Sequence, residues 1–205
     1  MKIAKIEKSK HKQERVLVYL EGGDLLRITG HELLQFGLYP GMDLSDELVV
    51  ELKRSAAHSQ VRERGAQIAS SRMLSKKELT ERLTRKGAGR EEAEETAEWL
   101  EELGAVNDRL YAGVIVRHYA AMGYGAGRVK QELFRRGVKR ELWDEAMEEL
   151  PPAEEAVERF LQSRLKGKTL DRATGKKLSD ALLRRGFSWQ EIRPVLHRMG
   201  EDIEE

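Results

Sequence analysis

The chain has 205 residues with 40% hydrophobic content, which is ordinary for a folded soluble protein with a packed core. Its 37 Lys and Arg nearly balance its 36 Asp and Glu, so the net charge of +1 by itself indicates neither a nucleic-acid-binding protein nor an acidic tail. The lack of cysteine excludes disulfides and cysteine-ligated metals. The sequence has neither a signal-peptide pattern nor a run of about 18 apolar residues, so we expect a cytoplasmic protein with no membrane span.

Residues 1–54 predict a small β-rich N-terminal extension. The segments "MKIAKIE" and "RVLVYL" are rich in apolar and β-branched residues, and "EGGD" at 21–24 is a turn signal before "LLRIT". One short helix is predicted over 31–36, and turns follow in "GLYPGM".

Three copies of one amphipathic segment follow, each closed by a glycine. They are "KELTERLTRKG" ending at Gly87, "RVKQELFRRG" at Gly137 and "KKLSDALLRRG" at Gly186, so the period is 50 and then 49 residues. Apolar residues four apart predict a helix in each copy. The glycine suits the left-handed position that ends a helix, and the residue after it can fold back on the leucine four positions before the glycine.

Further helices are predicted on both sides of each repeated helix. Those before it are expected near 57–71, 108–122 and 152–166, and amphipathic helices are expected after each glycine. "SKKE" at 75–78 predicts a capping box, whereas the other two copies carry glycine at the expected helix start, in "GYGAGR" and "ATGKK". The fold is therefore mostly α, with three-helix repeats at 55–106, 107–150 and 151–205. Because one such unit has a marginal core, the units should pack end to end.

The charge alternates along these repeats. Basic residues outnumber acidic ones by seven to two over 72–90, six to one over 123–140 and eight to two over 164–186. Segments 91–105 and 141–155 each hold seven acidic residues and no basic one, and 187–205 holds five acidic against two basic. These patterns fit solvated helix faces that complement helix dipoles. They also fit a basic stripe that binds a polyanion or an acidic protein groove, which is the interpretation we favour.

No enzyme, metal or cofactor site is predicted. "GKT" at 167–169 lacks the first glycine of a phosphate-binding loop, and "GYGAG" at 123–127 joins two helices and does not follow a strand. The acidic runs should stay hydrated, so they are no catalytic pair. The histidines are scattered, and one tryptophan per repeat is expected to anchor a core; these residues are His11, His31, His58, His118 and His197, and Trp99, Trp143 and Trp189.

The segments "ELTERLTRKG" and "LEELGAVNDRLYAGVIVRHYAAMGYGAGRVKQELFRRGV" resemble the RecX family of bacterial recombination regulators. The resemblance is most specific between residues 70 and 150. It is carried by Leu100, Leu103, Gly104, Asn107, Asp108, Tyr111, Ala112, Arg117, Gly123, Tyr124 and Gly125.

The resemblance implies an elongated, curved array of three-helix units that lies in the groove of the RecA filament on single-stranded DNA. Family members there reduce RecA ATPase, strand exchange and coprotease activity, within DNA repair, homologous recombination and the SOS response. Basic residues of the repeated helices and the turns after them would meet the filament: Arg128, Lys130, Arg135, Arg136, Lys139 and Arg140, with Arg85, Lys86, Arg184 and Arg185. Tyr124 either contacts the partner or packs the turn, with packing preferred, and Asp108 is expected to cap the helix leading to Tyr111.

Two other functions remain open from the residues. Small three-helix units can dock a helix in the major groove, so direct DNA contact is one alternative. A scaffold for another partner is the second. We expect a monomer, because an array with two distinct ends has no need to dimerise.

Overall fold

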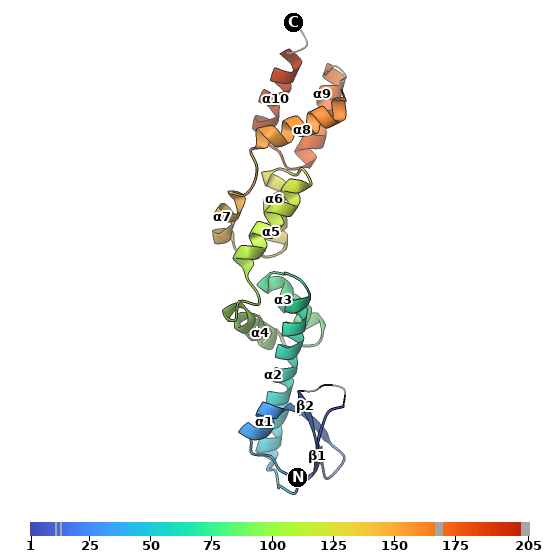
Figure 1. Ribbon diagram of the computed structural model, residues 1–205, viewed down its shortest axis with the longest axis vertical. Coiled ribbons are helices and arrows are strands. Elements are labelled where there is room, and N and C mark those ends of the chain that lie inside the picture. Colours follow the sequence, from blue (N-terminus) through green and yellow to red (C-terminus); the bar gives the residue numbers. More distant parts are fainter. Residues whose placement is uncertain (11, 13, 167–169, 202–205) are drawn as a thin grey trace. The chain divides into compact units, whose positions relative to one another are not determined.

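The computed structural model describes residues 1–10, 12, 14–166 and 170–201, so His11 and the "GKT" segment at 167–169 lie outside the described part. The described chain is mostly helical, with a small sheet near the N-terminus (Figure 1). It divides into two compact units. The first contains Met1–Arg72 and Thr80–Leu100, and the second contains Met73–Leu79 and Glu101–Glu205.

The N-terminal sheet has three antiparallel strands in the order β1, β2, β3, as the β-rich prediction requires. The strands are β1 (Ile3–Lys8), β2 (Arg15–Leu20) and β3 (Leu25–Thr29), followed by α1 (Gly30–Gln35). Val18 in the middle strand pairs with Ile6 and Leu26. Helix α1 starts one residue before the expected position, where Thr29 and Glu32 form a capping box.

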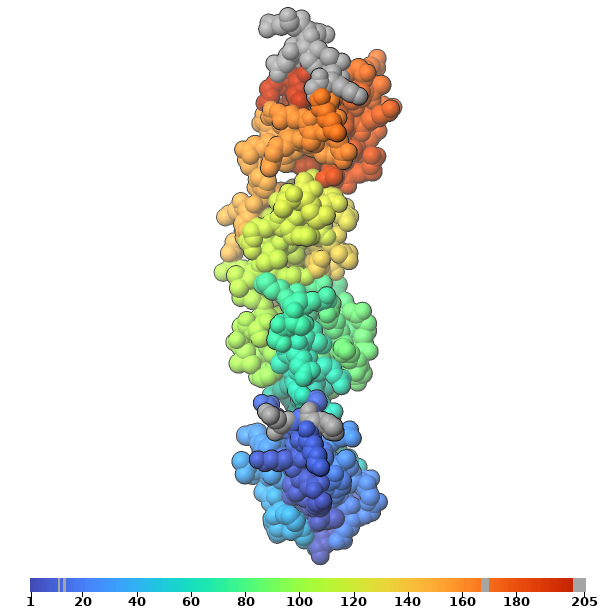
Figure 2. All heavy atoms as spheres, turned by 45° about the vertical axis from the view of Figure 1, so that its right-hand side comes forward, coloured from blue at the N-terminus to red at the C-terminus, as the bar shows by residue number. Residues whose placement is uncertain are grey.

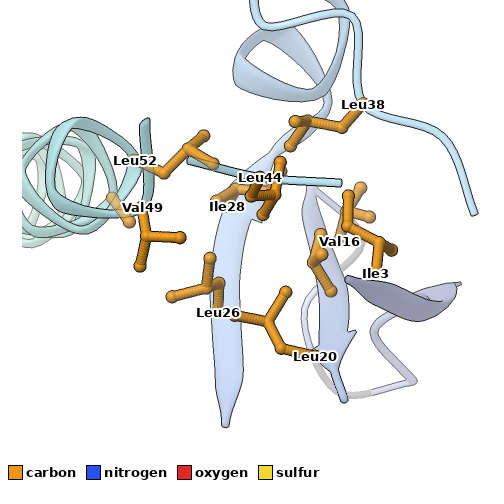
Figure 3. Close-up of a cluster of buried hydrophobic side chains, with 11 residues drawn as sticks. Ile3, Val16, Leu20, Leu26, Ile28, Leu38, Leu44, Val49 and Leu52 are labelled. Atoms are coloured by element: carbon orange, nitrogen blue, oxygen red, sulfur yellow. The ribbon is translucent and has the colours of Figure 1, made fainter. Parts of the chain in front are cut away.

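The core of this region lies between the sheet and helix α2 (Asp46–Ser71) (Figure 3). Val49 and Leu52 of α2 point toward Leu26 and Ile28 of β3. Helix α2 runs through the expected boundary between residues 54 and 55, because its first half covers the sheet while its second half belongs to the first repeat. Near its end Gly65 leaves room for α4, since an added Cβ would stand 2.8 Å from the Thr96 methyl.

The remaining described helices form three-helix repeats (Figure 1). Repeat 1 combines α2 with α3 (Lys76–Arg85) and α4 (Arg90–Glu102). Repeat 2 has α5 (Asp108–Ala121), α6 (Ala126–Arg135) and a short third element, η1 (Arg140–Leu142) with α7 (Trp143–Met147). Repeat 3 has α8 (Ala153–Leu165), α9 (Arg172–Arg184) and α10 (Trp189–Glu201). These helices confirm the predicted mostly α fold.

The three helix stops follow the predicted geometry. The closing glycines Gly87, Gly137 and Gly186 have φ angles of +93°, +74° and +88°. The N–H of the residue after each glycine donates to the carbonyl of the leucine four positions before that glycine, at 3.1, 3.0 and 3.2 Å. All of these leucines are fully buried. The repeated sequence therefore encodes a helix stop with its hydrophobic contact.

The helix starts follow the predictions in part. Ser75 and Glu78 form the expected capping box of α3, and Gly125 is the N-cap of α6. The predicted glycine start of α9 is wrong, because the Asp171 carboxylate accepts from the Thr174 N–H and the helix begins at Arg172. Gly175 consequently lies inside α9.

The tryptophans differ from one repeat to the next. Trp143 packs against the core of repeat 2 and donates its ring N–H to the Val138 carbonyl at 3.0 Å. Trp99 is half-buried beneath the guanidinium of Arg62. Trp189 is 52% exposed, so its expected role as a core anchor is wrong.

Candidate partner-binding surface

The exposed basic residues of repeat 2 lie on α6 and on the turn after it. Lys130, Arg135, Lys139 and Arg140 are exposed. Arg135 pairs with Glu132 at 2.6 Å, Lys139 stands 3.8 Å from Glu141, and Arg140 lies over the Trp143 ring. Lys130 makes no ion pair with any residue that the structure describes. We call these four residues the α6 basic surface.

The carboxylate of Glu132 orders the arginines of α6. Glu132 is 3% exposed and lies 3.1 Å from Arg128 and 2.6 Å from Arg135. Burial alone would raise the pKa of the Glu132 carboxyl, but hydrogen bonds from Arg135 and Tyr119 and the charges of Arg135 and Arg128 hold that pKa below its ordinary value. The carboxylate therefore stays ionised at neutral pH and fixes these side chains.

An apolar residue also lies on α6. Phe134 is 67% exposed, and it stands between Lys130 and Arg135 in the last turns of the helix. Leu183 holds the equivalent place in α9 and is 44% exposed. The sequence interpretation overlooked both residues, although each follows directly after the buried leucine and so points away from the core stripe. The surface of α6 thus combines positive charge with an aromatic ring.

Arg136 has a different position from its basic neighbours. Its guanidinium donates to the Tyr111 hydroxyl and stands 3.4 Å from Glu78 at the start of α3. It also lies over the Tyr111 ring, 5.7 Å from the centroid. The Arg136 side chain is 27% exposed. It therefore joins the end of α6 to α5 and to the start of α3.

Arg185 takes the equivalent position between repeats 2 and 3. It donates to the carbonyls of Met122 and Gly123 at 2.9 and 3.1 Å. Its guanidinium lies 5.3 Å from the Tyr124 ring centre and 5.0 Å from that of Phe160.

Tyr124 belongs to the same junction between repeats 2 and 3. Its ring lies 5.5 Å from the Tyr119 ring and 6.0 Å from the Arg128 guanidinium. The half-buried Tyr124 and Arg128 therefore pack where the repeats meet.

Hydrogen bonds to backbone carbonyls complete both junctions of the second unit. In each, the start of one repeated helix donates to the end of the next: Ser75 Oγ donates to the Arg136 carbonyl, and the Gly125 N–H donates to the Arg185 carbonyl at 2.9 Å. The Gly127 N–H also donates to the Gly186 carbonyl at 2.9 Å. A helix start carries partial positive charge and a helix end partial negative charge, so this contact is favourable for both.

Asp108 belongs to one of these junctions. Asn107 is the cap of α5, because its side chain accepts from the Leu110 N–H at 3.0 Å. The expected capping role of Asp108 on its own helix is therefore wrong. Its carboxylate accepts from the Lys76 N–H at 2.8 Å and so caps α3. Burial is the main cause that raises the pKa of Asp108.

The other expected binding residues are distributed over both units. Arg85 and Lys86 lie at the exposed end of α3 in the first unit. The Arg85 Nε donates to the Glu81 carbonyl at 3.2 Å, and the Lys86 carbonyl accepts from Arg64 at 2.9 Å. Arg184 is exposed at the end of α9 in the second unit.

The described residues contain neither a metal-binding cluster nor a membrane-spanning helix. No group of three or more His, Asp or Glu side chains there is placed to hold a metal ion. No helix in the described ranges has the length and apolar character needed to cross a membrane.

Comparison with known proteins identifies the family. A model described as "RecX, second three-helix domain" matches residues 107–147, which correspond to repeat 2. The regulatory protein RecX of Streptococcus gordonii is 28% identical over 208 residues, covering 100% of this chain and 79% of the relative. This chain is therefore similar to a RecX protein over its whole length. The RecX protein of Geobacillus kaustophilus is 29% identical, with 99% of this chain and 79% of the relative covered.

Solved structures of RecX proteins share the fold. A crystal structure of regulatory protein RecX has a TM-score of 0.77 at 22% identity and covers 98% of both chains. The structure of RecX from Lactobacillus salivarius has a TM-score of 0.59 at 19% identity, covering 70% of this chain and 96% of that one. The resemblance to the RecX family that the sequence indicated is confirmed by these comparisons.

Proposed function

We propose that this RecX protein binds the RecA filament on single-stranded DNA and restrains RecA ATPase, strand exchange and coprotease activity. Similarity to RecX proteins over nearly the whole chain supports this proposal, because these relatives are named regulatory proteins. The cellular setting would be homologous recombination, DNA repair and the SOS response in the cytoplasm. The protein would act as a monomer and without catalysis, by occupying a groove that RecA needs free.

The observation that carries the proposal is the composition of the α6 basic surface. Lys130 and Arg135 flank Phe134, which is 67% exposed. An exposed aromatic ring beside arginine is typical of the residues that dominate binding at protein interfaces. Binding to phosphates alone requires only the cations. We therefore favour a partner that offers both acidic groups and an apolar pocket.

The predicted binding residues would divide into two roles. The exposed cations would meet the partner directly; these are Lys130, Arg135, Lys139 and Arg140, with Arg85, Lys86 and Arg184. Arg128, Arg136, Arg185 and Tyr124 would act through the junctions, by holding neighbouring repeats in the register that displays those cations.

The test is the DNA-dependent ATPase of RecA on single-stranded DNA, with this protein titrated in at fixed salt. Binding of the protein to the same DNA without RecA is measured in parallel. We expect inhibition at protein concentrations where little bare DNA is bound. Tight, salt-sensitive binding to bare DNA without inhibition would favour a direct DNA-binding protein. An absence of both would leave a scaffold for another partner.

A further inference from the structure

A second concentration of positive charge lies in a pocket between repeats 2 and 3, away from the exposed face of α6. The pocket has a volume of about 690 Å³ and is formed by the end of α5, one face of α8 and the end of α9. Figure 2 shows the yellow surface of repeat 2 directly against the orange surface of repeat 3 in this part of the second unit. Arg159, Arg164, Lys166 and Arg185 contribute the charge, and we call this site the α8 pocket.

Among the described residues that line the α8 pocket, none carries a carboxylate. Helix α8 separates its charges by face: Glu154 and Glu158 pair with Arg198 of α10, whereas Arg159 and Arg164 line the pocket. Within the described residues, neither Arg159 nor Arg164 has an acidic partner. The side chains of these two arginines are therefore available to an anion from outside.

In the part of the chain that the structure describes, the terminal nitrogens of these arginines make no hydrogen bond. Arg159 donates from Nε to the Glu155 carbonyl at 3.3 Å, and Arg164 lies over the Phe160 ring at 5.6 Å. Both contacts orient a side chain without neutralising its charge. Arg185 reaches the pocket from α9 and is fixed by the carbonyls of Met122 and Gly123. The pocket is thus built of guanidinium groups whose positions are set in advance.

One explanation for the cations of the α8 pocket is that they neutralise the partial negative charges of nearby helix ends. Those partial charges are too small to account for four cations. Helices α5, α8 and α9 all end near the pocket, and each end carries roughly half a negative charge. That amounts to between one and two charges, against four full positive charges. Arg159 also stands six residues before the end of α8, outside the last turn where the helix dipole acts.

The chemistry of the lining favours phosphate. Guanidinium groups form paired hydrogen bonds with phosphate oxygens, and three of the four cations are arginines. Arg159 and Arg164 are five residues apart on one helix, which corresponds to about 7.5 Å along its axis. That separation places the two groups against different phosphates of a chain. A single small anion would favour cations that converge on one point.

We propose that the α8 pocket is a binding site for the phosphate groups of a single-stranded nucleic acid. The site requires no RecA, so it can exist whether or not the α6 basic surface binds a filament. It also differs from groove recognition by a docked helix, because its ligand is the sugar-phosphate backbone of an unpaired strand.

The test measures binding of a fluorescent oligothymidylate by anisotropy, without RecA, over a series of salt concentrations. The pocket variant carries Arg159→Gln, Arg164→Gln and Lys166→Gln. The control variant carries Arg109→Gln, Arg117→Gln and Arg193→Gln, which removes the same charge from exposed positions of the same unit. All six side chains are exposed, so both variants should keep the circular dichroism spectrum of the parent.

We expect the pocket variant to bind at least about tenfold more weakly at physiological salt, while the control variant stays close to the parent. The slope of log affinity against log salt should fall by about 2 in the pocket variant, because each phosphate contact on a single strand contributes about 0.7. Equal losses in both variants would overturn the proposal, since general charge would then explain the binding. Unchanged binding in the pocket variant would also overturn it.

Competition experiments identify the source of the anion. An oligothymidylate with an uncharged methylphosphonate backbone should fail to compete. Tripolyphosphate and ATP should compete weakly, because they occupy few of the cations. If either of these competes as well as the strand, the strand assignment is wrong and the ligand is a free polyphosphate. If polyglutamate competes as well as the strand, the phosphate assignment is wrong and the pocket serves an acidic protein.

Discussion

Asp108 is a buried carboxylate that supports a helix of the neighbouring repeat. It accepts the Lys76 N–H, one of the donors that the start of α3 leaves without a partner in its own helix. Burial raises the pKa of Asp108, the Lys76 N–H opposes that rise, and the charge of Glu101 adds to it. The hydrogen bond therefore contributes to stability while the charge itself opposes folding.

Two substitutions separate the hydrogen bond of Asp108 from its charge. A raised pKa in the folded state means that Asp108 adds stability below its unfolded pKa and loses it as the pH rises through the folded pKa. At neutral pH the ionised group is therefore unfavourable. Asp108→Asn keeps an acceptor for the Lys76 N–H, so we expect it to be at least as stable as the parent at pH 7. Asp108→Ala should lose about 1–2 kcal/mol, because the donor loses its partner.

Urea denaturation of the parent and both Asp108 variants at pH 7 and near pH 4 tests this expectation. Any advantage of Asp108→Asn should shrink at the lower pH, where the parent carboxyl takes up its proton. Equal losses in Asp108→Asn and Asp108→Ala at pH 7 would mean that α3 requires the full negative charge of the carboxylate.

At the level of elements, all three closing glycines end a helix, and Gly137 and Gly186 also contact the preceding repeat. All three have positive φ, so an alanine at any of them costs about 1–2 kcal/mol from backbone strain. Their surroundings differ. A Cβ on Gly87 would have nothing within 4 Å, a Cβ on Gly137 would meet the flexible Lys77 side chain, and a Cβ on Gly186 would stand 2.2 Å from the Arg128 backbone nitrogen.

We expect the cost of alanine to rise from Gly87 to Gly137 to Gly186. Gly87→Ala should cost only the backbone strain. Gly137→Ala adds a displacement of Lys77, and Gly186→Ala forces the backbones of repeats 2 and 3 apart. Thermal unfolding and hydrogen exchange of the three variants measure the order, and Gly186→Ala should also speed exchange at the Gly125 and Gly127 N–H groups. Equal costs at all three positions would show that the repeats do not pack through these glycines.

The sequence predicted the helix stops well and the helix starts less well, for a physical reason. A stop is built from a leucine, a glycine and the next residue, all within six positions, so the pattern of "LTRKGA" contains the whole structure. The starts depend on partners chosen by tertiary structure. Asp108 caps α3 from 32 residues away, and no local pattern indicates this.

The same limit applies to the candidate site. The count of basic residues predicted positive charge on the repeated helices, but Arg135 and Arg136 are equal in sequence terms. Only the structure separates them, since Arg135 is exposed while Arg136 contacts Tyr111 and Glu78. The α8 pocket was not predicted, because Arg159 and Arg185 come from helices of different character that meet only in the fold.

For the whole molecule, the net charge of +1 conceals a division between cations that face outward and cations that hold repeats together. The two kinds should respond differently to neutralisation. Exposed surface substitutions usually change stability by less than about 0.5 kcal/mol. Removing a partly buried, hydrogen-bonded guanidinium leaves its partners unsatisfied and costs about 1–3 kcal/mol.

Three variants of this protein, compared in two assays, test that division. Lys130→Gln combined with Lys139→Gln should leave the unfolding curve unchanged. It should raise the concentration needed to inhibit RecA ATPase by roughly tenfold and weaken the salt dependence of inhibition, because it removes steering charge from the α6 basic surface. Phe134→Ala should also keep the stability of the parent. It should weaken inhibition by about tenfold or more, because an apolar anchor is lost, and the salt dependence of inhibition should stay the same, because no charge changes. Arg136→Gln differs from these two, because its main effect should be a lower unfolding temperature. If all three variants lose inhibition only in proportion to lost stability, the α6 basic surface is not the contact, and the filament must meet another face of the protein.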